Sequence, residues 1–115
     1  MKPWYSRAVF FVRDTPAALA FYVERLGFER VWQHDEDGRA IVCQVQRDGL
    51  ELILAQDAGK AGHGRVFLSL DAEQTRALEA DLEKRKLPVR ETHWGMRVIE
   101  ILDEDGNELY FSPPG

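Results

Sequence analysis

Charged and aromatic side chains recur at alternate positions of several otherwise aliphatic segments. Carboxylates can hold cations, guanidinium groups pair with anions, and aromatic rings stack on flat molecules. The side chains of this kind are Arg7, Phe11, Glu51, Arg65, Phe67, Glu108 and Tyr110. Aromatic and charged groups that share a concave surface are the usual lining of a small-molecule site. The pattern predicts such a site if the fold brings these residues to one face.

Strand alternation assigns these side chains to one face of a sheet. Neighbours in a strand point to opposite sides, and the positions between the mixed residues are apolar. The apolar sets are Ala8, Phe10 and Val12; Leu50, Leu52 and Leu54; Val66, Leu68 and Leu70; Leu109 and Phe111. They belong beneath helices, which leaves the mixed set on the opposite, concave face. A second subunit could instead cover this face, with its charges in interface ion pairs, and both arrangements can hold together.

The elements that must position these residues form two similar halves. The first half, residues 5–56, contains a strand over 5–12 and a helix over 16–26 with Thr15 as its N-cap. Three strands follow, over 29–33, 39–46 and 50–55. A glycine-containing linker, residues 57–64, separates this half from the next.

The second half, residues 65–112, repeats the same order of elements. A strand over 66–70 precedes a helix that Asp71 and Gln74 begin with capping-box spacing. Strands over 89–92, 96–102 and 107–112 complete the half. Residues 9–14 match residues 66–71 at an offset of 57, which indicates an internal duplication. We expect one α+β domain of two βαβββ modules, with one helix for each sheet and therefore one open face.

Charge and composition narrow the class of partner. The chain of 115 residues has 15 Lys plus Arg against 20 Asp plus Glu, a net charge of -5 that argues against nucleic acid. Its one cysteine, Cys43, excludes an internal disulfide and fits a reducing compartment. We find no apolar run that predicts a signal peptide or a membrane span. The expected setting is the cytoplasm, without a membrane partner.

Two motifs within this pattern resemble the vicinal oxygen chelate superfamily. They are Phe21-Tyr22-Val23-Glu24-Arg25-Leu26-Gly27-Phe28 and the segment from Asp103 to Phe111. The superfamily contains glyoxalase I, extradiol dioxygenases, fosfomycin-resistance enzymes and bleomycin-resistance proteins. The resemblance covers nearly the whole chain and implies curved mixed sheets around a cleft. It also implies a homodimer, formed by domain swapping or by module pairing.

Metal-dependent members of the superfamily hold their metal with His, Glu or Gln at four strand positions. Counted from the motifs, these positions correspond here to Arg7, Glu51, Arg65 and Tyr110. Arginine has no free lone pair to ligate a cation, so the resemblance implies no metal and no cofactor. A shifted set of Glu51, His63 and Glu108 is the alternative metal site.

Among members without a metal, the chain most resembles the bleomycin-resistance proteins. Trp94-Gly95 stands where those proteins place a tryptophan that stacks on the flat part of the drug, and Trp32 resembles the opposite aromatic wall. Alternatively, both tryptophans are core or interface residues. The implied ligand is small, planar and cationic, although Arg7 and Arg65 leave an anionic or neutral ligand open.

Three functions follow from these observations. The first is a homodimer that binds and sequesters a drug without chemistry, through Trp32, Trp94, Phe11, Phe67, Tyr110, Glu51, Glu108, Arg7 and Arg65. The second is a metal-dependent glyoxalase- or dioxygenase-type enzyme. The third is a regulatory or structural dimer that binds an unidentified metabolite.

Overall fold

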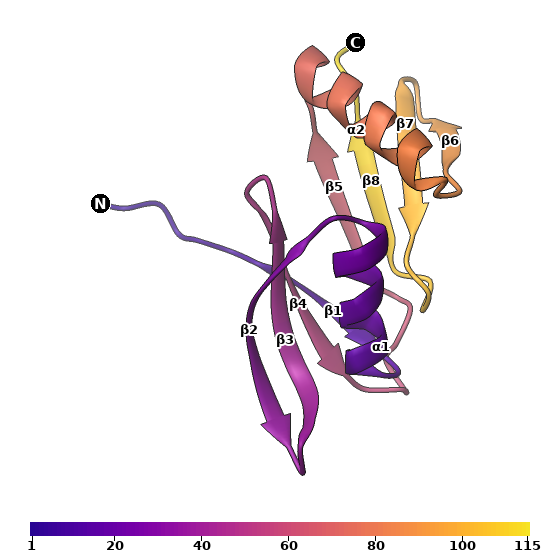
Figure 1. Cartoon of the computed structure of the whole chain (residues 1–115). Helices are drawn as coiled ribbons and strands as arrows, with labels where there is room; N and C mark the ends of the chain where they lie inside the picture. The colour runs from indigo at the N-terminus through magenta and orange to yellow at the C-terminus, as the bar shows by residue number, and fades with distance from the viewer.

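Two four-stranded sheets, each with one helix layer, make up the fold (Figure 1). The computed structural model describes residues 1–115, apart from the side chain of His93. The first module contains β1 (Ala8–Val12), α1 (Thr15–Ala20), η1 (Phe21–Arg25), β2 (Glu29–Glu36), β3 (Arg39–Arg47) and β4 (Leu50–Gln56). The second contains β5 (Arg65–Ser69), α2 (Ala72–Arg85), β6 (Arg90–His93), β7 (Arg97–Leu102) and β8 (Glu108–Ser112).

The two sheets have the same topology. Their strand orders are β1-β4-β3-β2 and β5-β8-β7-β6. In each sheet the first strand runs parallel to the last, and the remaining pairs are antiparallel. Asp14 and Asp71 cap the two helices at equivalent places. The predicted pair of βαβββ modules is confirmed.

The first helix begins one residue earlier than predicted. Asp14, not Thr15, is the N-cap, and its Oδ1 accepts a hydrogen bond from the Ala17 N–H at 3.4 Å. Thr15 is fully buried, and its hydroxyl instead donates to the Ile41 carbonyl at 2.9 Å. The predicted helix over 16–26 is α-helical only to Ala20. It then widens into the π-helical turn η1.

The N-terminal segment also differs from the prediction. A strand was expected from residue 5, but β1 begins at Ala8, which pairs with Leu52 of β4. Residues 1–7 are exposed and extend away from the body of the molecule (Figure 1). Trp4, 98% exposed, therefore lies outside the core.

The second helix follows its predicted pattern. Asp71 and Gln74 form the reciprocal capping box, with hydrogen bonds of 2.7 and 2.9 Å. Thr75, Leu78 and Leu82 are its buried residues. The helix ends at Arg85, and its C-cap Lys86 has a left-handed φ of 54°, shortly before Pro88.

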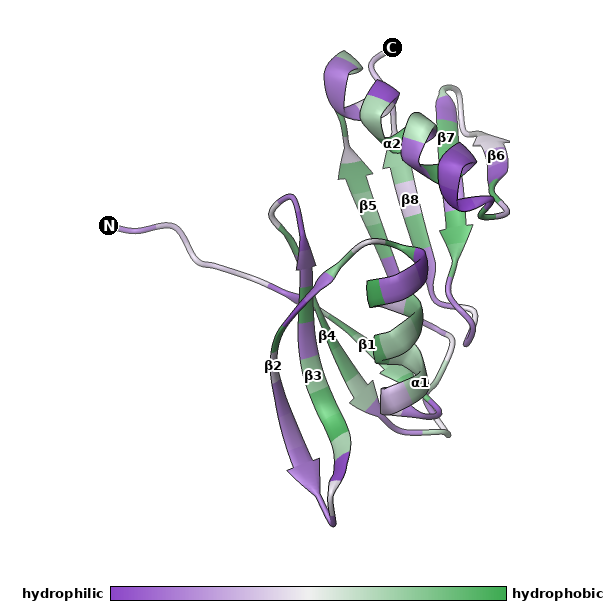
Figure 2. Cartoon of the chain, in the orientation of Figure 1, coloured by the Kyte–Doolittle hydropathy of each residue, from purple (hydrophilic) through white to green (hydrophobic). Residues whose placement is uncertain are grey.

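One continuous apolar core joins the two modules. It contains alternate residues of the strands, including Phe10, Leu52 and Leu109, together with helix residues such as Leu78. Figure 2 shows the contrast along the sheets, since β2 is mainly hydrophilic while β7 is mainly hydrophobic. Cys43 is fully buried in this core, and burial raises the pKa of its thiol to about 11. An uncharged thiol of this kind is a poor nucleophile.

A buried polar cluster holds the modules together near the linker. The Asn107 side chain accepts from the Gly64 N–H at 2.8 Å and donates to the Phe11 carbonyl at 3.0 Å. It also donates to Asp103 Oδ2 at 2.9 Å, and the Tyr22 hydroxyl donates to that same oxygen at 2.8 Å. Helix, strand, linker and turn therefore share one fully satisfied network.

Candidate ligand-binding site

The open face of the first sheet carries polar and aromatic side chains on four strands. Phe11 and Glu51 alternate with core residues of β1 and β4, as the sequence predicts. Gln44 of β3 pairs in register with Ile53 of β4, and Trp32 of β2 pairs with Gln44. The side chains of Trp32, Gln44, Ile53, Glu51 and Phe11 therefore face the same way.

A hydrogen-bonded chain of three side chains crosses this face. The Trp32 indole N–H donates to Gln44 Oε1 at 2.8 Å, and Gln44 Nε2 donates to Glu51 Oε1 at 2.9 Å. Gln44 is only 3% exposed, whereas Trp32 keeps 41% of its surface exposed. Gln44 is not among the residues predicted from the sequence, although a polar residue inside an apolar strand is the available signal.

The open face of the second sheet gathers three aromatic rings. The Phe67 and Trp94 rings lie nearly parallel, with centroids 6.2 Å apart and an interplanar angle of 21°. The Trp94 and Tyr110 centroids are 4.8 Å apart at 58°. Phe67 and Trp94 are 45% and 53% exposed, so neither is a core residue of this chain. The rings present an aromatic surface to a ligand or to another subunit.

Arginines neutralise the carboxylates on that second face. Arg65 Nε lies 3.3 Å from Glu108 Oε2, and Arg90 pairs with the buried Glu100. Glu108 Oε2 is buried and has no hydrogen-bond partner among the described atoms, so its contact with Arg65 is an ion pair without hydrogen-bond alignment. Two of the predicted site residues, Arg65 and Glu108, therefore hold each other.

The positive charge at Arg7 has a different neighbour. Its guanidinium lies 4.5 Å from the centroid of the Tyr5 ring. Glu51 forms no ion pair with any described side chain, although Arg7 directly precedes the β1 residue that pairs with Leu52. Glu51 is thus a carboxylate that accepts a hydrogen bond from Gln44 but has no arginine or lysine partner among the described side chains.

The residues at the expected metal positions do not suit a divalent cation. Arg7 and Arg65 supply charge of the wrong sign, which leaves Glu51 as the one carboxylate at these four positions. In the alternative set, Glu108 already pairs with Arg65, and His63 precedes β5. Among the described side chains, no three His, Cys, Asp or Glu residues form a group that could hold a metal ion.

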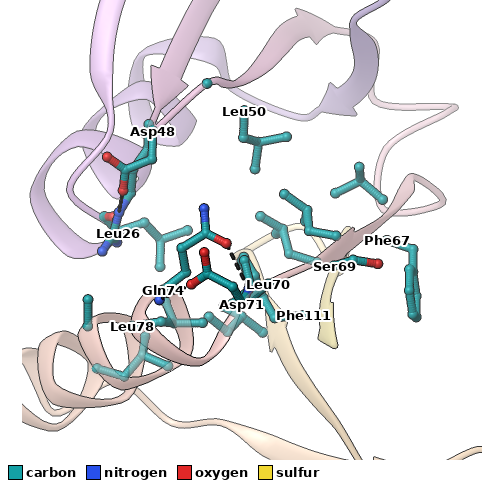
Figure 3. A pocket seen from close by; sticks show the side chains of 18 of the residues that line it. Leu26, Asp48, Leu50, Phe67, Ser69, Leu70, Asp71, Gln74, Leu78 and Phe111 are labelled. Carbon is teal, nitrogen blue, oxygen red and sulfur yellow. Dashed lines mark hydrogen bonds and ion pairs between the residues drawn. The ribbon is translucent and has the colours of Figure 1, made fainter. Parts of the chain in front are cut away.

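A pocket of about 830 Å³ opens on the helix side, and Phe67 is the one predicted site residue that lines it. Figure 3 shows Leu26, Asp48 and Leu50 of the first module on one side of it, with Gln74 and Leu78 of α2 on the other. The edge strand β5 lines it from Val66 to Ser69. Most of its lining is apolar, so it resembles an incompletely covered core rather than a polar recognition site.

The predicted site residues thus fall into two groups, one in each module, and Arg7 and Trp94 lie just outside the strands. Arg7, Phe11, Trp32 and Glu51 belong to the first module. Arg65, Phe67, Trp94, Glu108 and Tyr110 belong to the second. No strand pairing links the two sheets in the described chain, so a cleft that uses both groups needs them to face each other across space.

No described helix has the length and apolar character to cross a membrane.

Paired βαβββ modules with helices on one face and open sheets on the other define a class that contains both enzymes and binding proteins. The Glyoxalase/Bleomycin resistance protein/Dioxygenase superfamily model matches residues 4–111. The chain belongs to this superfamily, which confirms the resemblance found in the sequence. The comparison with curated proteins gave no match.

Solved structures with the same fold cover the whole chain. A glyoxalase/bleomycin resistance protein from Catenulispora acidiphila DSM 44928 has 25% identity and a TM-score of 0.78, covering 98% of this chain and 100% of that chain. TnmS3, an antibiotic binding protein from Streptomyces sp. CB03234, has 25% identity and a TM-score of 0.65, with 100% of both chains covered. A bleomycin-binding protein from Streptomyces verticillus, solved with copper(II)-bleomycin, has 20% identity and a TM-score of 0.71, covering 100% and 99%.

Proposed function

We propose that this protein binds and sequesters a small planar, positively charged molecule, such as a bleomycin-type drug, without catalysing a reaction. The aromatic surface of Phe67, Trp94 and Tyr110 is the observation that carries the proposal. Similarity to the antibiotic binding protein TnmS3 supports it. Arginines at two positions where metal-dependent relatives need ligands also favour binding over metal chemistry.

The physical basis is stacking combined with charge. A flat heteroaromatic ring gains roughly 1 kcal/mol beyond area burial for each aromatic ring that it contacts. Because Arg65 and Arg90 already neutralise Glu108 and Glu100, the second sheet offers a surface for the uncharged flat part of a ligand. Glu51 on the first sheet offers the negative charge that a cation needs.

The proposal includes a homodimer that brings the two open faces together. Phe67, Trp94 and Met96 remain 45–53% exposed on the second face, and Trp32 is 41% exposed on the first. A second copy that covers these faces would bury this apolar surface and create two clefts, each able to hold one ligand. Light scattering coupled to gel filtration is the direct measurement, and a monomer at micromolar concentration would contradict this part of the proposal.

Isothermal titration calorimetry with metal-free and copper-loaded bleomycin tests the binding function. We expect one ligand per chain, and about tenfold weaker binding by Trp94→Ala because truncated aromatic anchors commonly cost 1–2 kcal/mol. Val23→Ala, at an exposed residue of η1, is the control and should bind as the wild type does. The absence of any heat of binding, together with no protection of expressing cells, would overturn the proposal.

Metal analysis tests the catalytic alternative. Protein purified without chelators and then exposed to nickel, zinc, manganese or iron should retain substoichiometric metal after desalting. One equivalent of retained metal, abolished by Glu51→Gln, would instead support a metal-dependent enzyme.

A further inference from the structure

The chain of Trp32, Gln44 and Glu51 has the properties of a recognition unit. We propose that it binds a cationic N–H group attached to a flat aromatic ring. Trp32 stacks on the ring, Glu51 pairs with the cation, and Gln44 is the positioning residue between them. This inference rests on the proposed binding function and specifies which end of the ligand each module holds.

The orientation of the Gln44 amide follows from its neighbours. An indole N–H can only donate, so the amide oxygen must face Trp32, at 2.8 Å. The amide nitrogen must then face Glu51, where it donates at 2.9 Å to a carboxylate that accepts. Since Gln44 is 3% exposed, neither hydrogen bond is easily replaced by water. The amide therefore fixes both the rotation of the indole and the position of the carboxylate.

Glu51 keeps acceptor capacity for a ligand. A carboxylate has about four acceptor directions, and Gln44 is its one described side-chain donor. Glu108 and Glu100, on the inner strands of the second sheet, each have an arginine, but Glu51 has none among the described ion pairs. Of these three carboxylates, Glu51 gains most from a cation, because it has no counterion to displace.

The indole completes the unit. Its N–H is occupied by Gln44, so Trp32 can contribute only its ring surface to a ligand, and 41% of the residue is exposed for that purpose. Gln44 links the indole to the Glu51 carboxylate by hydrogen bonds of 2.8 and 2.9 Å, so a flat ring on Trp32 can extend toward that carboxylate. The matching ligand is a protonated amine, amidinium or guanidinium on a planar ring, with the rest of the molecule directed to the aromatic surface of the second module.

A pair of related ring systems tests this assignment. Calorimetry at pH 7.5 would compare 9-aminoacridine, a flat cation with N–H groups, with neutral acridine. Glu51→Gln keeps an acceptor for Gln44 but removes the charge, and should weaken 9-aminoacridine binding about tenfold, the usual effect of losing one charge-assisted hydrogen bond. Acridine binding should stay within about twofold of wild type, because its stacking surface is unchanged.

Gln46, two residues along β3 from Gln44, and its partner Glu29 on β2 provide matched controls. Gln46 Nε2 donates to Glu29 Oε1 at 2.9 Å on the same face, but Gln46 has no tryptophan partner. Gln44→Met should lose most of the preference for 9-aminoacridine, whereas Gln46→Met and Glu29→Gln should keep it. In proton–nitrogen NMR spectra, the Trp32 indole signal, assigned by its loss in Trp32→Phe, should move and exchange faster only in Gln44→Met.

The outcomes separate this inference from the broader proposal. Equal effects of Gln44→Met and Gln46→Met, or unchanged 9-aminoacridine affinity in Glu51→Gln, would overturn the inference. If Trp94→Ala still weakened binding in that case, the proposed function would stand without it. Wild-type protein that binds none of 9-aminoacridine, acridine and bleomycin would overturn both.

Discussion

At the scale of single residues, the buried Asp103 carboxylate accepts several hydrogen bonds, one of them from the Tyr22 hydroxyl. Asp103 accepts from the Tyr22 hydroxyl, from the Asn107 amide and from the backbone N–H groups of Asp105 and Asn107. Tyr22 is fully buried and Asp103 is 7% exposed. Water cannot readily replace a donor that is removed from this site.

Tyr22→Phe should lower the free energy of unfolding by about 1–2 kcal/mol, because a buried carboxylate then loses one donor. Urea denaturation followed by circular dichroism measures the change. Tyr5→Phe, at an exposed residue outside the strands, should leave the stability unchanged. A loss below about 0.3 kcal/mol in Tyr22→Phe would show that the hydroxyl contributes little to folding.

The same tyrosine predicts a pH dependence. Burial, reinforced by the negative charge of Asp103, raises the pKa of Tyr22 well above its usual value. The unfolded chain therefore releases the proton above about pH 10 while the folded chain keeps it, so stability is full below that pH and falls above it. Between pH 9.5 and 11 the wild type should lose stability more steeply than Tyr22→Phe. Parallel curves for the two proteins would contradict this linkage.

At the scale of elements, the second helix depends on a local signal at its start. Asp71→Ala removes the side-chain half of the capping box and should cost about 1 kcal/mol, lowering the melting temperature by several degrees. Arg76→Ala, at an exposed position of the same helix, provides the comparison. The cap has no energetic role if both variants melt at the same temperature.

Helices and strands could be predicted where the residues that determine them lie close together in the sequence. The α2 cap and its stripe of Thr75, Leu78 and Leu82 lie within one helix, and all were predicted correctly. The sequence predicts Thr15 as the α1 cap and is wrong there, because the partner of its hydroxyl, the Ile41 carbonyl, is 26 residues away. Residues 5–7 have a strand-like composition, but β1 starts where its pairing with β4 starts.

The candidate site was predictable to a similar degree. Alternation placed Glu51, Phe67 and Tyr110 opposite the core residues of their strands, because the period of a strand is fixed by the backbone. The division of these residues between two sheets depends on long-range pairing, which no local pattern encodes. A polar residue in an apolar strand marks Gln44 as unusual, but its role depends on Trp32 and Glu51, which lie on neighbouring strands.

At the scale of the whole molecule, Asn107 couples the two modules. Its buried side chain makes three hydrogen bonds, to Gly64, Phe11 and Asp103. Asn107→Ala leaves those partners unsatisfied and should cost on the order of 3 kcal/mol. It should also speed proteolytic cleavage within residues 57–64, because the linker loses its contact with the turn.

Glu104→Ala changes an exposed residue of the same turn and is the matched control for this experiment. Its urea midpoint and cleavage rate should equal those of the wild type. If Asn107→Ala unfolds in one transition with the wild-type midpoint, the Asn107 hydrogen bonds do not contribute to holding the modules together.

Two glycines at the junction make the linker a structural part of the interior. A β-carbon on Gly62 would lie 2.2 Å from the Asp105 carbonyl oxygen, and one on Gly64 would lie 2.5 Å from the Phe10 ring. The turn at Gly38, between β2 and β3, has no atom within 4 Å of such a carbon. An epitope tag or a fluorescent reporter therefore belongs in the β2–β3 turn. Placed in the 57–64 segment, although it separates two repeats, the same insertion would force the halves apart.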